Sequence, residues 1–285
     1  MKSRVKYFFL MPGLIWVLAF TLFPLLYALC LSFTNARLGR DTTFVGFQNY
    51  IALLSDSKAG EVALVSVSLT LSSTFLTMVL GTVIAWLFNH ELPGLKVMRA
   101  IMTMPLFAAP IAIGYMGVVI FNEQHGPINR LIAFFGGTPV NWMAAPGPAR
   151  LAVLITDVWQ WTPFVFIIIL ATMQNLPEEV LEAARLDTSS DWIIFRNITF
   201  PYIAPALGTV ALLRVVETFK ILDIPLTLTG GGPGQATQTY SYYTYVQGLR
   251  FPFQQGYASA MAYLVVFVAV IISGIYFWRV RARFD

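Results

Sequence analysis

Four charged side chains stand at intervals of three residues in an otherwise apolar stretch of the sequence. They alternate in sign and are Arg214, Glu217, Lys220 and Asp223. Residues three apart share one face of a helix and can form ion pairs, which offsets part of the roughly 2.5–3.5 kcal/mol that a charge costs at the centre of a membrane helix. Two interpretations follow: a salt-bridged seam against a partner subunit, or the lining of a solute pathway or gate. Asp157, in the preceding apolar stretch, is either buried beside a polar partner or lines a cavity.

Aromatic and amide side chains occur together in that preceding stretch, where Trp159, Gln160 and Trp161 are consecutive. Sugars present apolar C–H patches beside arrays of hydroxyl groups, so their sites combine aromatic faces with planar polar groups. These three residues are therefore candidates for sugar contacts in the middle of a membrane. A later tyrosine-rich run includes Tyr243. It is either a substrate contact or part of the aromatic belt that is common at membrane interfaces.

The sequence lacks the residues that several classes of enzyme need. The sequence contains no Gly-Lys dipeptide and hence no G-x-x-x-x-G-K-[ST] loop for nucleotide phosphates. Its one glycine-rich candidate for a phosphate nest has no lysine after it and consists of Gly230, Gly231, Gly232, Pro233 and Gly234. Cys30 is the only cysteine, and an apolar span separates the two histidines, His90 and His125. The sequence therefore predicts no metal site and no catalytic residues. We expect no cofactor on this chain, so any energy from ATP must come from another chain.

The elements that position these residues are membrane-spanning helices. Hydrophobic residues make up 57% and charged residues 11% of the sequence, and the mean hydropathy is +0.70. A soluble domain carries roughly 25% charged residues, so this composition predicts an all-α membrane protein. Apolar stretches of about 20 residues can span a bilayer. Six are present, at Tyr7–Phe33, Val62–Asn89, Val97–Phe121, Leu151–Met173, Ile203–Leu228 and Ala258–Trp278. Prolines are expected to kink the third span, and the whole chain, 1–285, is predicted to form one transmembrane domain.

The basic residues outside the spans predict the orientation of the chain. The larger group lies on one side and comprises Lys2, Arg4, Lys6, Lys96, Arg99, Arg185, Arg196, Arg279, Arg281 and Arg283. The smaller group lies on the other side and comprises Arg37, Arg40, Lys58, Arg130, Arg150 and Arg250. Because cytoplasmic loops carry the excess of Lys and Arg, both termini and the loop between the fourth and fifth spans are predicted to be cytoplasmic. The net charge of +4 is modest and requires no nucleic acid as a partner.

The loop 175–201 is longer and more charged than a simple connector. A first helix is predicted to begin with Asn175 as its N-cap, and a second helix is predicted at Asp191–Asn197. Ala183 and Ala184 are expected to form one flat face flanked by carboxylates, which suits close docking against a basic groove. A helix lying at the membrane interface is the alternative, but such helices favour Lys and Arg on their polar face.

A spaced motif occupies this loop. Glu182-Ala183-Ala184 is followed after three residues by Thr188, and after nine more by Ile198-Thr199-Phe200-Pro201. This pattern resembles the EAA loop of permease subunits of binding-protein-dependent ABC importers, which reads EAA, three residues, Gly, nine residues and I-x-L-P. Thr188 stands where that family usually has Gly, and Phe200 stands where it has Leu.

The resemblance implies a role for the loop. In that family the loop is a coupling helix that seats in a cleft of the ATPase subunit, and ATP and Mg²⁺ are used by the ATPase. Glu182 would then face a basic residue of the ATPase, and the adjacent alanines would allow close packing. The residues implied to couple to the ATPase are Glu178, Glu179, Glu182, Ala183, Ala184, Arg185, Asp187, Thr188 and Pro201.

Other segments narrow the resemblance to maltose-type sugar permeases. They are the residues 44–50, 159–164, 217–223, 229–237 and 256–260. Such a permease would form a heterodimer with a second permease in the bacterial inner membrane, and would work with an ATPase dimer and a periplasmic substrate-binding protein. The candidate sugar pathway consists of Trp159, Gln160, Trp161, Glu217, Lys220, Asp223 and Tyr243. The candidate loop facing the binding protein is Gly230, Gly231, Gly232, Pro233 and Gly234.

Two rival functions remain. An importer for a polyol or glycerol phosphate is the first, although the four charges at 214–223 sum to zero and favour a neutral solute. A secondary transporter driven by protons or sodium is the second. Such transporters usually contain internal repeats, which this sequence does not show convincingly, and the charged loop would then have no purpose.

Overall fold

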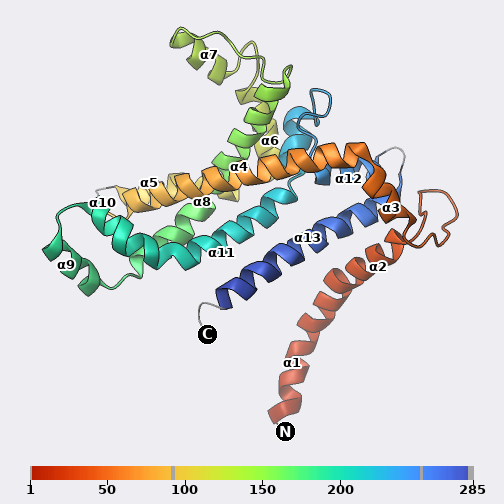
Figure 1. The fold of residues 1–285 in the computed structure, drawn as a ribbon, viewed down its shortest axis with the longest axis horizontal. Helices are drawn as coiled ribbons and strands as arrows, with labels where there is room; N and C mark the ends of the chain where they lie inside the picture. The colour runs from red at the N-terminus through yellow and green to blue at the C-terminus, as the bar shows by residue number, and fades with distance from the viewer. Residues whose placement is uncertain (1, 91–93, 251–252, 282–285) are drawn as a thin grey trace. The chain divides into compact units, whose positions relative to one another are not determined.

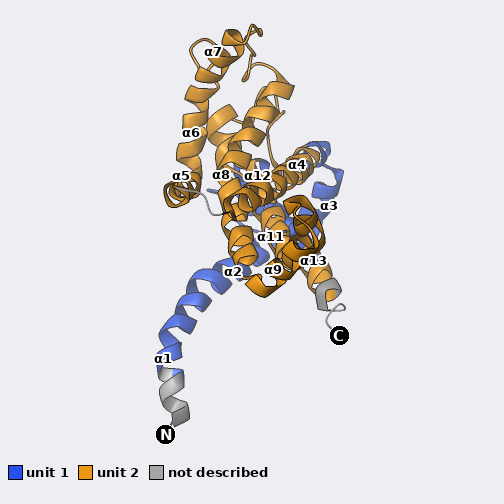
Figure 2. Ribbon diagram, turned by 90° about the vertical axis from the view of Figure 1, so that its left-hand side faces the viewer, with its two compact units in different colours: residues 1–61, 243–271 blue, residues 62–242, 272–285 orange. Residues whose placement is uncertain are grey.

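The computed structural model describes residues 2–90, 94–250 and 253–281, and every regular element in these ranges is helical. The chain divides into two compact units, residues 1–61 with 243–271 and residues 62–242 with 272–285 (Figure 2). We describe each unit by itself, and the single transmembrane domain stays a prediction. Arg283, counted above among the basic residues, lies outside the described residues.

Helices build both units (Figure 1). The first unit holds α1 (Lys2–Val17), the π-helical turn η1 (Leu18–Leu22), α2 (Phe23–Ser32) and α3 (Gln48–Ser55). The second unit holds most of α4 (Ser57–Phe88), followed by α5 (Leu95–Phe107), α6 (Pro110–Ile120), α7 (Pro127–Phe134), α8 (Pro146–Gln174), α9 (Glu178–Asp187), α10 (Asp191–Ile194), η2 (Phe195–Thr199), α11 (Phe200–Phe219) and η3 (Pro225–Thr229). Residues of α12 (Tyr240–Leu249) and α13 (Gln255–Arg281) belong to both units.

α8 is the central helix of the second unit. It packs against α5, α6, α11 and η3. Val165 and Phe166 of α8 are fully buried in a core that also contains Ala85 of α4 and Ile203 of α11. Gly81 lets α4 approach closely, because a Cβ atom added there would lie 2.6 Å from the Cβ of Val165. α8 therefore links α5, α6, α11 and η3.

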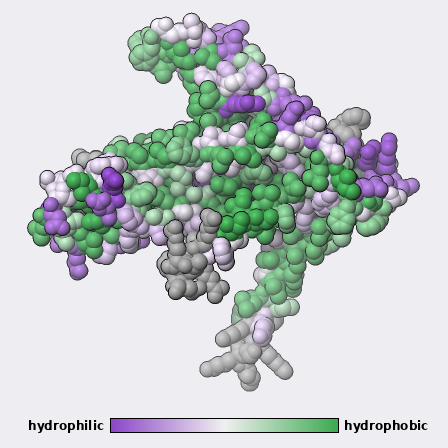
Figure 3. All heavy atoms as spheres, in the orientation of Figure 1, coloured by the Kyte–Doolittle hydropathy of each residue, from purple (hydrophilic) through white to green (hydrophobic). Residues whose placement is uncertain are grey.

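Five helical runs in the described residues are long and apolar enough to cross a membrane. They are Phe9–Ser32, Ser57–Phe88, Pro146–Gln174, Asp191–Phe219 and Gln255–Trp278. These helices carry exposed large apolar side chains, such as Leu71 and Phe75 of α4, which are 63% and 66% exposed. Surfaces of this kind face lipid or another subunit. Hydrophobic atoms cover the long helices in Figure 3, whereas hydrophilic atoms gather over α9 and α10.

The predicted third span is broken more sharply than a kinked helix. α5 and α6 meet at 102°, so the described residues contain a sixth candidate span only if the two helices are taken together. Pro110 lacks an N–H group, and its ring disfavours a helical backbone at the preceding residue. Ala109 is accordingly extended, with φ −62° and ψ 134°.

The predicted fifth span is displaced along the sequence. Its helical run begins at Asp191, where α10 continues through η2 into α11, and it ends at Phe219. The predicted end at Leu228 was wrong, because the helix stops at Phe219, with Lys220 as its C-cap, and residues 221 and 222 are not helical. Pro225–Thr229 instead form the separate turn η3, which packs against α6 and α8.

Asp56 organises the polar contacts of the first unit. Its carboxylate accepts hydrogen bonds from the hydroxyl groups of Tyr243 (2.9 Å) and Tyr257 (2.7 Å), and from the backbone N–H groups of Lys58 and Ala59 at the start of α4. Burial alone raises the pKa of the Asp56 carboxyl, but these four hydrogen bonds outweigh it and hold the pKa below its ordinary value of 3.8. Burial and the Asp56 carboxylate together raise the pKa of Tyr243 to about 12, so this hydroxyl stays a donor.

The lowered pKa of Asp56 predicts a pH dependence of stability. Because the folded-state pKa lies below the unfolded value, the stabilisation is present above the unfolded pKa and is lost as pH falls through the folded-state value. Asp56→Asn keeps an acceptor but removes the charge, so it should lower the unfolding midpoint at pH 7 by about 2–4 °C and flatten the fall of that midpoint between about pH 5 and 3. Thermal unfolding in micelles measures this, with the exposed Glu61→Gln as the control. An Asp56→Asn profile parallel to the wild type would contradict it.

Candidate functional site

A buried ion pair joins three helices of the second unit. Arg214 of α11 donates from Nη2 to Oδ2 of Asp157 on α8 at 2.7 Å and to Oγ of Ser73 on α4 at 3.0 Å. The Ser73 hydroxyl also donates to the Asp157 carboxylate. Arg214 and Ser73 are fully buried and Asp157 is 1% exposed. Of the two interpretations of Asp157, the structure therefore supports burial beside a polar partner.

The rest of the Arg214 guanidinium faces an aromatic ring. Its central carbon lies 4.9 Å from the ring centre of Trp161, a cation–π arrangement that gains strength when the cation is desolvated. Phe164 meets the same indole nearly edge-on, with ring centres 5.9 Å apart. The Nε and Nη1 atoms of Arg214 have no hydrogen-bond partner among the described residues. The Trp161 ring thus packs against the guanidinium of Arg214, whose Nε and Nη1 atoms make no hydrogen bond among the described residues.

The predicted alternation of ion pairs along one helix is only partly present. Glu217 and Lys220 form a pair at 2.9 Å, with side chains 38% and 55% exposed. Arg214 instead pairs across helices with Asp157. Asp223 lies beyond the end of α11, between that helix and η3, so it does not continue the helical stripe. The structure brings Glu217 and Lys220 together and separates Asp223 from their helical face.

The three consecutive candidates on α8 point in different directions, because adjacent helical residues do not share a face. Trp159 is 46% exposed and lines an apolar cavity of about 930 Å³ with α4 and α5 residues. Gln160 is buried, and its side-chain amide donates to the carbonyl of Ala108 at 3.4 Å. Only Trp161 lies against Arg214.

The glycine-rich segment forms a closed turn. Gly230, Gly231 and Gly234 have φ values of +60°, +83° and +60°, which favour glycine over any residue with a side chain. At Gly231 an added Cβ would also lie 2.4 Å from the ring of Tyr242. The Thr237 hydroxyl donates to the carbonyl of Gly232 at 3.0 Å. These contacts are those of a tight turn.

Tyr243 belongs to the first unit, where it bonds to Asp56 and has the ammonium group of Lys58 5.1 Å from its ring centre. It is 4% exposed. In that unit Tyr243 thus lies beside Asp56 and Lys58, and it shares Asp56 as a hydrogen-bond acceptor with Tyr257.

The charged loop contains a short helix with two distinct sides. α9 begins at Glu178, and Asn175 caps the end of α8 instead of the start of α9, so the predicted N-cap was wrong. Within α9 only Leu181 and Ala184 are not exposed, and the exposed residues include Glu179, Glu182, Ala183 and Leu186, which share one side at the spacing i, i+3, i+4, i+7. Ala184 is 6% exposed and turns inward, so the predicted flat alanine face was wrong. Leu186, which sequence reasoning missed, is 90% exposed, and the helical spacing from Glu179 could have identified it.

The remaining loop residues surround this helix. Glu178, Glu182 and Arg185 line a polar cavity of about 770 Å³ together with residues from the ends of α4, α5, α8 and α10. Asp187 is the last residue of α9 and is exposed, as is Pro201 in the first turn of α11. Thr188 is extended, with φ −154° and ψ 143°, and its hydroxyl accepts the N–H of Ser190 at 3.2 Å. This turn therefore does not require the glycine of the family pattern.

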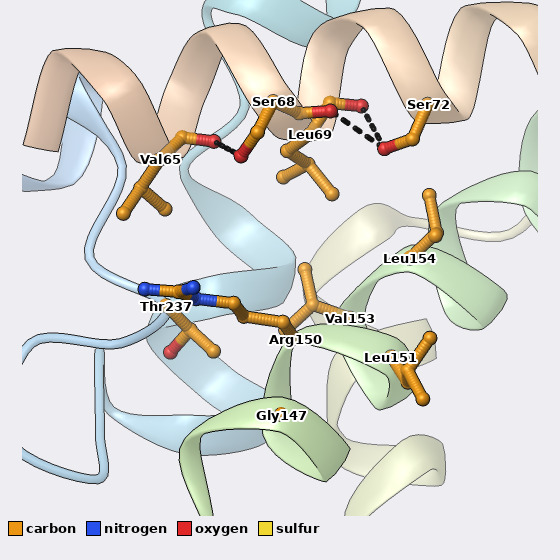
Figure 4. A pocket seen from close by; sticks show the side chains of 10 residues that line it. All are labelled: Val65, Ser68, Leu69, Ser72, Gly147, Arg150, Leu151, Val153, Leu154 and Thr237. Carbon is orange, nitrogen blue, oxygen red and sulfur yellow. Dashed lines mark hydrogen bonds between the residues drawn. The ribbon is translucent and has the colours of Figure 1, made fainter.

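A further apolar cavity of about 310 Å³ lies between α4 and α8 (Figure 4). The hydroxyls of Ser68 and Ser72 at its edge bond to carbonyls of their own helix. Arg150 extends across the cavity toward Thr237 in the figure and donates to the carbonyl of Ala236 at 2.7 Å. Arg150 thus ties the start of α8 to the segment that follows the glycine turn.

Comparison with known protein families identifies the family of this chain. The family described as binding-protein-dependent transport system inner membrane component matches residues 78–283. The chain belongs to this family. As such an inner membrane component it is a transport subunit whose ATPase is a separate chain.

Relatives of this inner membrane component match it over most of their length. It is 34% identical over 246 residues to the trehalose/maltose transport system permease protein MalF of Thermococcus litoralis, which covers 84% of this chain and 82% of the relative. It is 26% identical over 282 residues to the lactose transport system permease protein LacF of Rhizobium radiobacter, covering 96% and 93%. The crystal structure of a bacterial alginate ABC transporter with an alginate pentasaccharide-bound periplasmic protein contains a chain with the same fold, at TM-score 0.86, 19% identity and coverage of 96% and 93%.

Breaking the buried ion pair should destabilise this inner membrane component strongly. Asp157→Asn leaves the Arg214 charge buried without its partner, so we expect a loss of about 3–5 kcal/mol. The double variant Asp157→Leu with Arg214→Met removes both charges and should recover most of that loss. Unfolding in mixed micelles measures both, with Lys220→Met at the exposed pair as a control that costs at most about 1 kcal/mol. The single variants Asp157→Leu and Arg214→Met complete the double-mutant cycle, and additive effects of these two would contradict a coupled pair.

Proposed function

We propose that this chain is the permease subunit of an ATP-driven ABC importer that moves a sugar from the periplasm to the cytoplasm. The observation that carries this proposal is the full-length similarity to permeases named for trehalose, maltose and lactose. The charges also support it. The Arg214–Asp157 and Glu217–Lys220 pairs cancel within the chain, which suits an uncharged, hydroxylated solute.

The partners follow from the proposal. The chain pairs with a second, non-identical permease in the bacterial inner membrane, and two ATPase copies with ATP and Mg²⁺ lie on the cytoplasmic side with both termini. A periplasmic binding protein delivers the sugar to the opposite side, where the turn at Gly230, Gly231, Gly232, Pro233 and Gly234 contacts it. The sugar passes along Trp161, Glu217 and Lys220 of the second unit. The other predicted pathway residues are not part of this proposal, because Trp159 and Gln160 point in other directions, Asp223 lies beyond α11 and Tyr243 is buried in the first unit.

The loop containing α9 couples this pathway to the ATPase. Its exposed face offers carboxylates at Glu179 and Glu182 and an apolar contact at Leu186. Such a face fits a cleft with basic residues around an apolar floor. The Tyr202 hydroxyl donates to the carbonyl of Asn175 at 3.0 Å, which fastens the start of α11 to the end of α8. A movement of α9 therefore reaches both helices that carry the ion pair.

Reversing one charge on the coupling face should uncouple transport. Glu182→Lys places a cation opposite the basic cleft, so sugar-stimulated ATPase activity and uptake should fall to about one-tenth, a change of about 1.4 kcal/mol in coupling. Reconstituted vesicles with binding protein and maltose measure both activities. Glu61→Lys, an exposed site outside the loop, is the charge-matched control. Normal stimulation in Glu182→Lys would refute the coupling role.

The exposed leucine makes a separate prediction. Leu186→Asp should reduce capture of the ATPase in a detergent pull-down about tenfold or more, since a buried apolar contact would be replaced by a charge. Asp187→Asn is a neighbouring control that leaves the apolar contact in place. ATPase capture by Leu186→Asp at the wild-type level would exclude Leu186 from the interface.

A further inference from the structure

Trp161 is held on two sides within the second unit. The Arg214 guanidinium lies over its ring at 4.9 Å, and Phe164 meets it edge-on at 5.9 Å. Arg214 is fully buried, whereas Trp161 keeps part of its surface exposed. A buried guanidinium and a half-buried phenyl ring therefore hold the indole, while part of the Trp161 side chain stays accessible.

The guanidinium that fixes this ring is itself fixed. Asp157 and Ser73 both bind its Nη2 atom, at 2.7 Å and 3.0 Å, and Ser73 also donates to Asp157. These two bonds anchor one end of the guanidinium, and a planar guanidinium packs on aromatic faces. Asp157 thus determines the position of Arg214, and Arg214 determines the position of Trp161.

We infer that Asp157 is a positioning residue for sugar binding, which acts through Arg214 to hold Trp161 as the stacking face for one pyranose ring. This inference rests on the proposed function. The C–H face of a sugar packs on an aromatic ring, and a ring already fixed loses less freedom when the sugar binds. Because the Asp157 carboxylate already neutralises Arg214, no free cation is available among the described residues of this site for an anionic ligand. The same site therefore takes an uncharged pyranose in preference to a sugar acid or sugar phosphate.

The test measures maltose binding to the full-length chain assembled with its partner permease and ATPase in lipid nanodiscs. Saturation-transfer NMR detects which maltose protons contact the protein and provides the Kd. Asp157→Asn should raise that Kd about tenfold, because the cation–π contact that orients the ring is weakened. Asp157→Glu keeps the charge and should lie between Asp157→Asn and the wild type. Trp161→Leu should abolish the signals of the pyranose C–H protons.

Two readouts separate positioning from a general loss of structure. Because Asp157→Asn destabilises the chain, maltose binding and basal ATPase activity are both measured on the assembled complex alone, and its Kd for maltose should rise out of proportion to any change in its basal ATPase activity. Ser72→Ala is the matched control, since this hydroxyl is next to Ser73 and bonds only within its own helix turn; it should change neither quantity. If Asp157→Asn does not assemble, Arg214→Lys keeps the charge but removes the planar group from the indole, and the same loss of affinity is expected.

Three outcomes would overturn the inference. The first is wild-type maltose affinity in assembled Asp157→Asn or Arg214→Lys. The second is maltose binding that survives Trp161→Leu, which would leave the proposed importer function standing. The third is a parallel loss of basal ATPase activity and binding, which would make Asp157 structural only. A wild-type assembly that neither binds nor transports maltose, trehalose or lactose would overturn the proposed function itself.

Discussion

The arrangement of the second unit depends on one buried ion pair. An arginine without exposure to solvent is tolerated only when a carboxylate and hydrogen-bond partners compensate its charge. Asp157 and Ser73 meet that requirement for Arg214 from two other helices. α4, α8 and α11 must therefore keep one register at this level, because sliding any of them by a turn would separate the charges. The close approach at Gly81, where α4 meets Val165 of α8, leaves little room for such sliding.

The same three helices are joined a second time near the charged loop. Trp86 at the end of α4 lies 5.4 Å from Phe195 of η2 and 6.3 Å from Trp192 of α10, between ring centres. The Tyr202 hydroxyl links α11 to the end of α8. At about 1.5 Å per residue, the distance along α11 from Phe200 to Arg214 is about 21 Å. Under the proposed coupling role of α9, these two levels of contact would make α4, α8 and α11 move together.

Part of this arrangement could be predicted from the sequence, because long apolar runs and a loop of acidic residues are local signals. Helix boundaries were less predictable, since Pro110 breaks a span that it was expected only to kink, and α11 ends at Phe219 with no proline or glycine at its end. The ion pair was missed for a different reason. Spacing along one helix suggested partners three residues from Arg214, whereas its partner Asp157 lies 57 residues away. Ser73 is one serine among several on α4, and nothing in its sequence context distinguishes it.

The internal pairing of charges also bears on what energises transport. A carrier driven by protons or sodium needs an ionisable group inside the membrane that can exchange its ion with water. In the described part of the second unit, Asp157 is 1% exposed and engaged by Arg214 and Ser73, and Glu217 is engaged by Lys220. Releasing Asp157 to carry a proton would strand the Arg214 charge in the core, at a cost of several kcal/mol. Such a carboxylate is suited to holding a structure together, which agrees with a transport subunit whose ATPase is a separate chain.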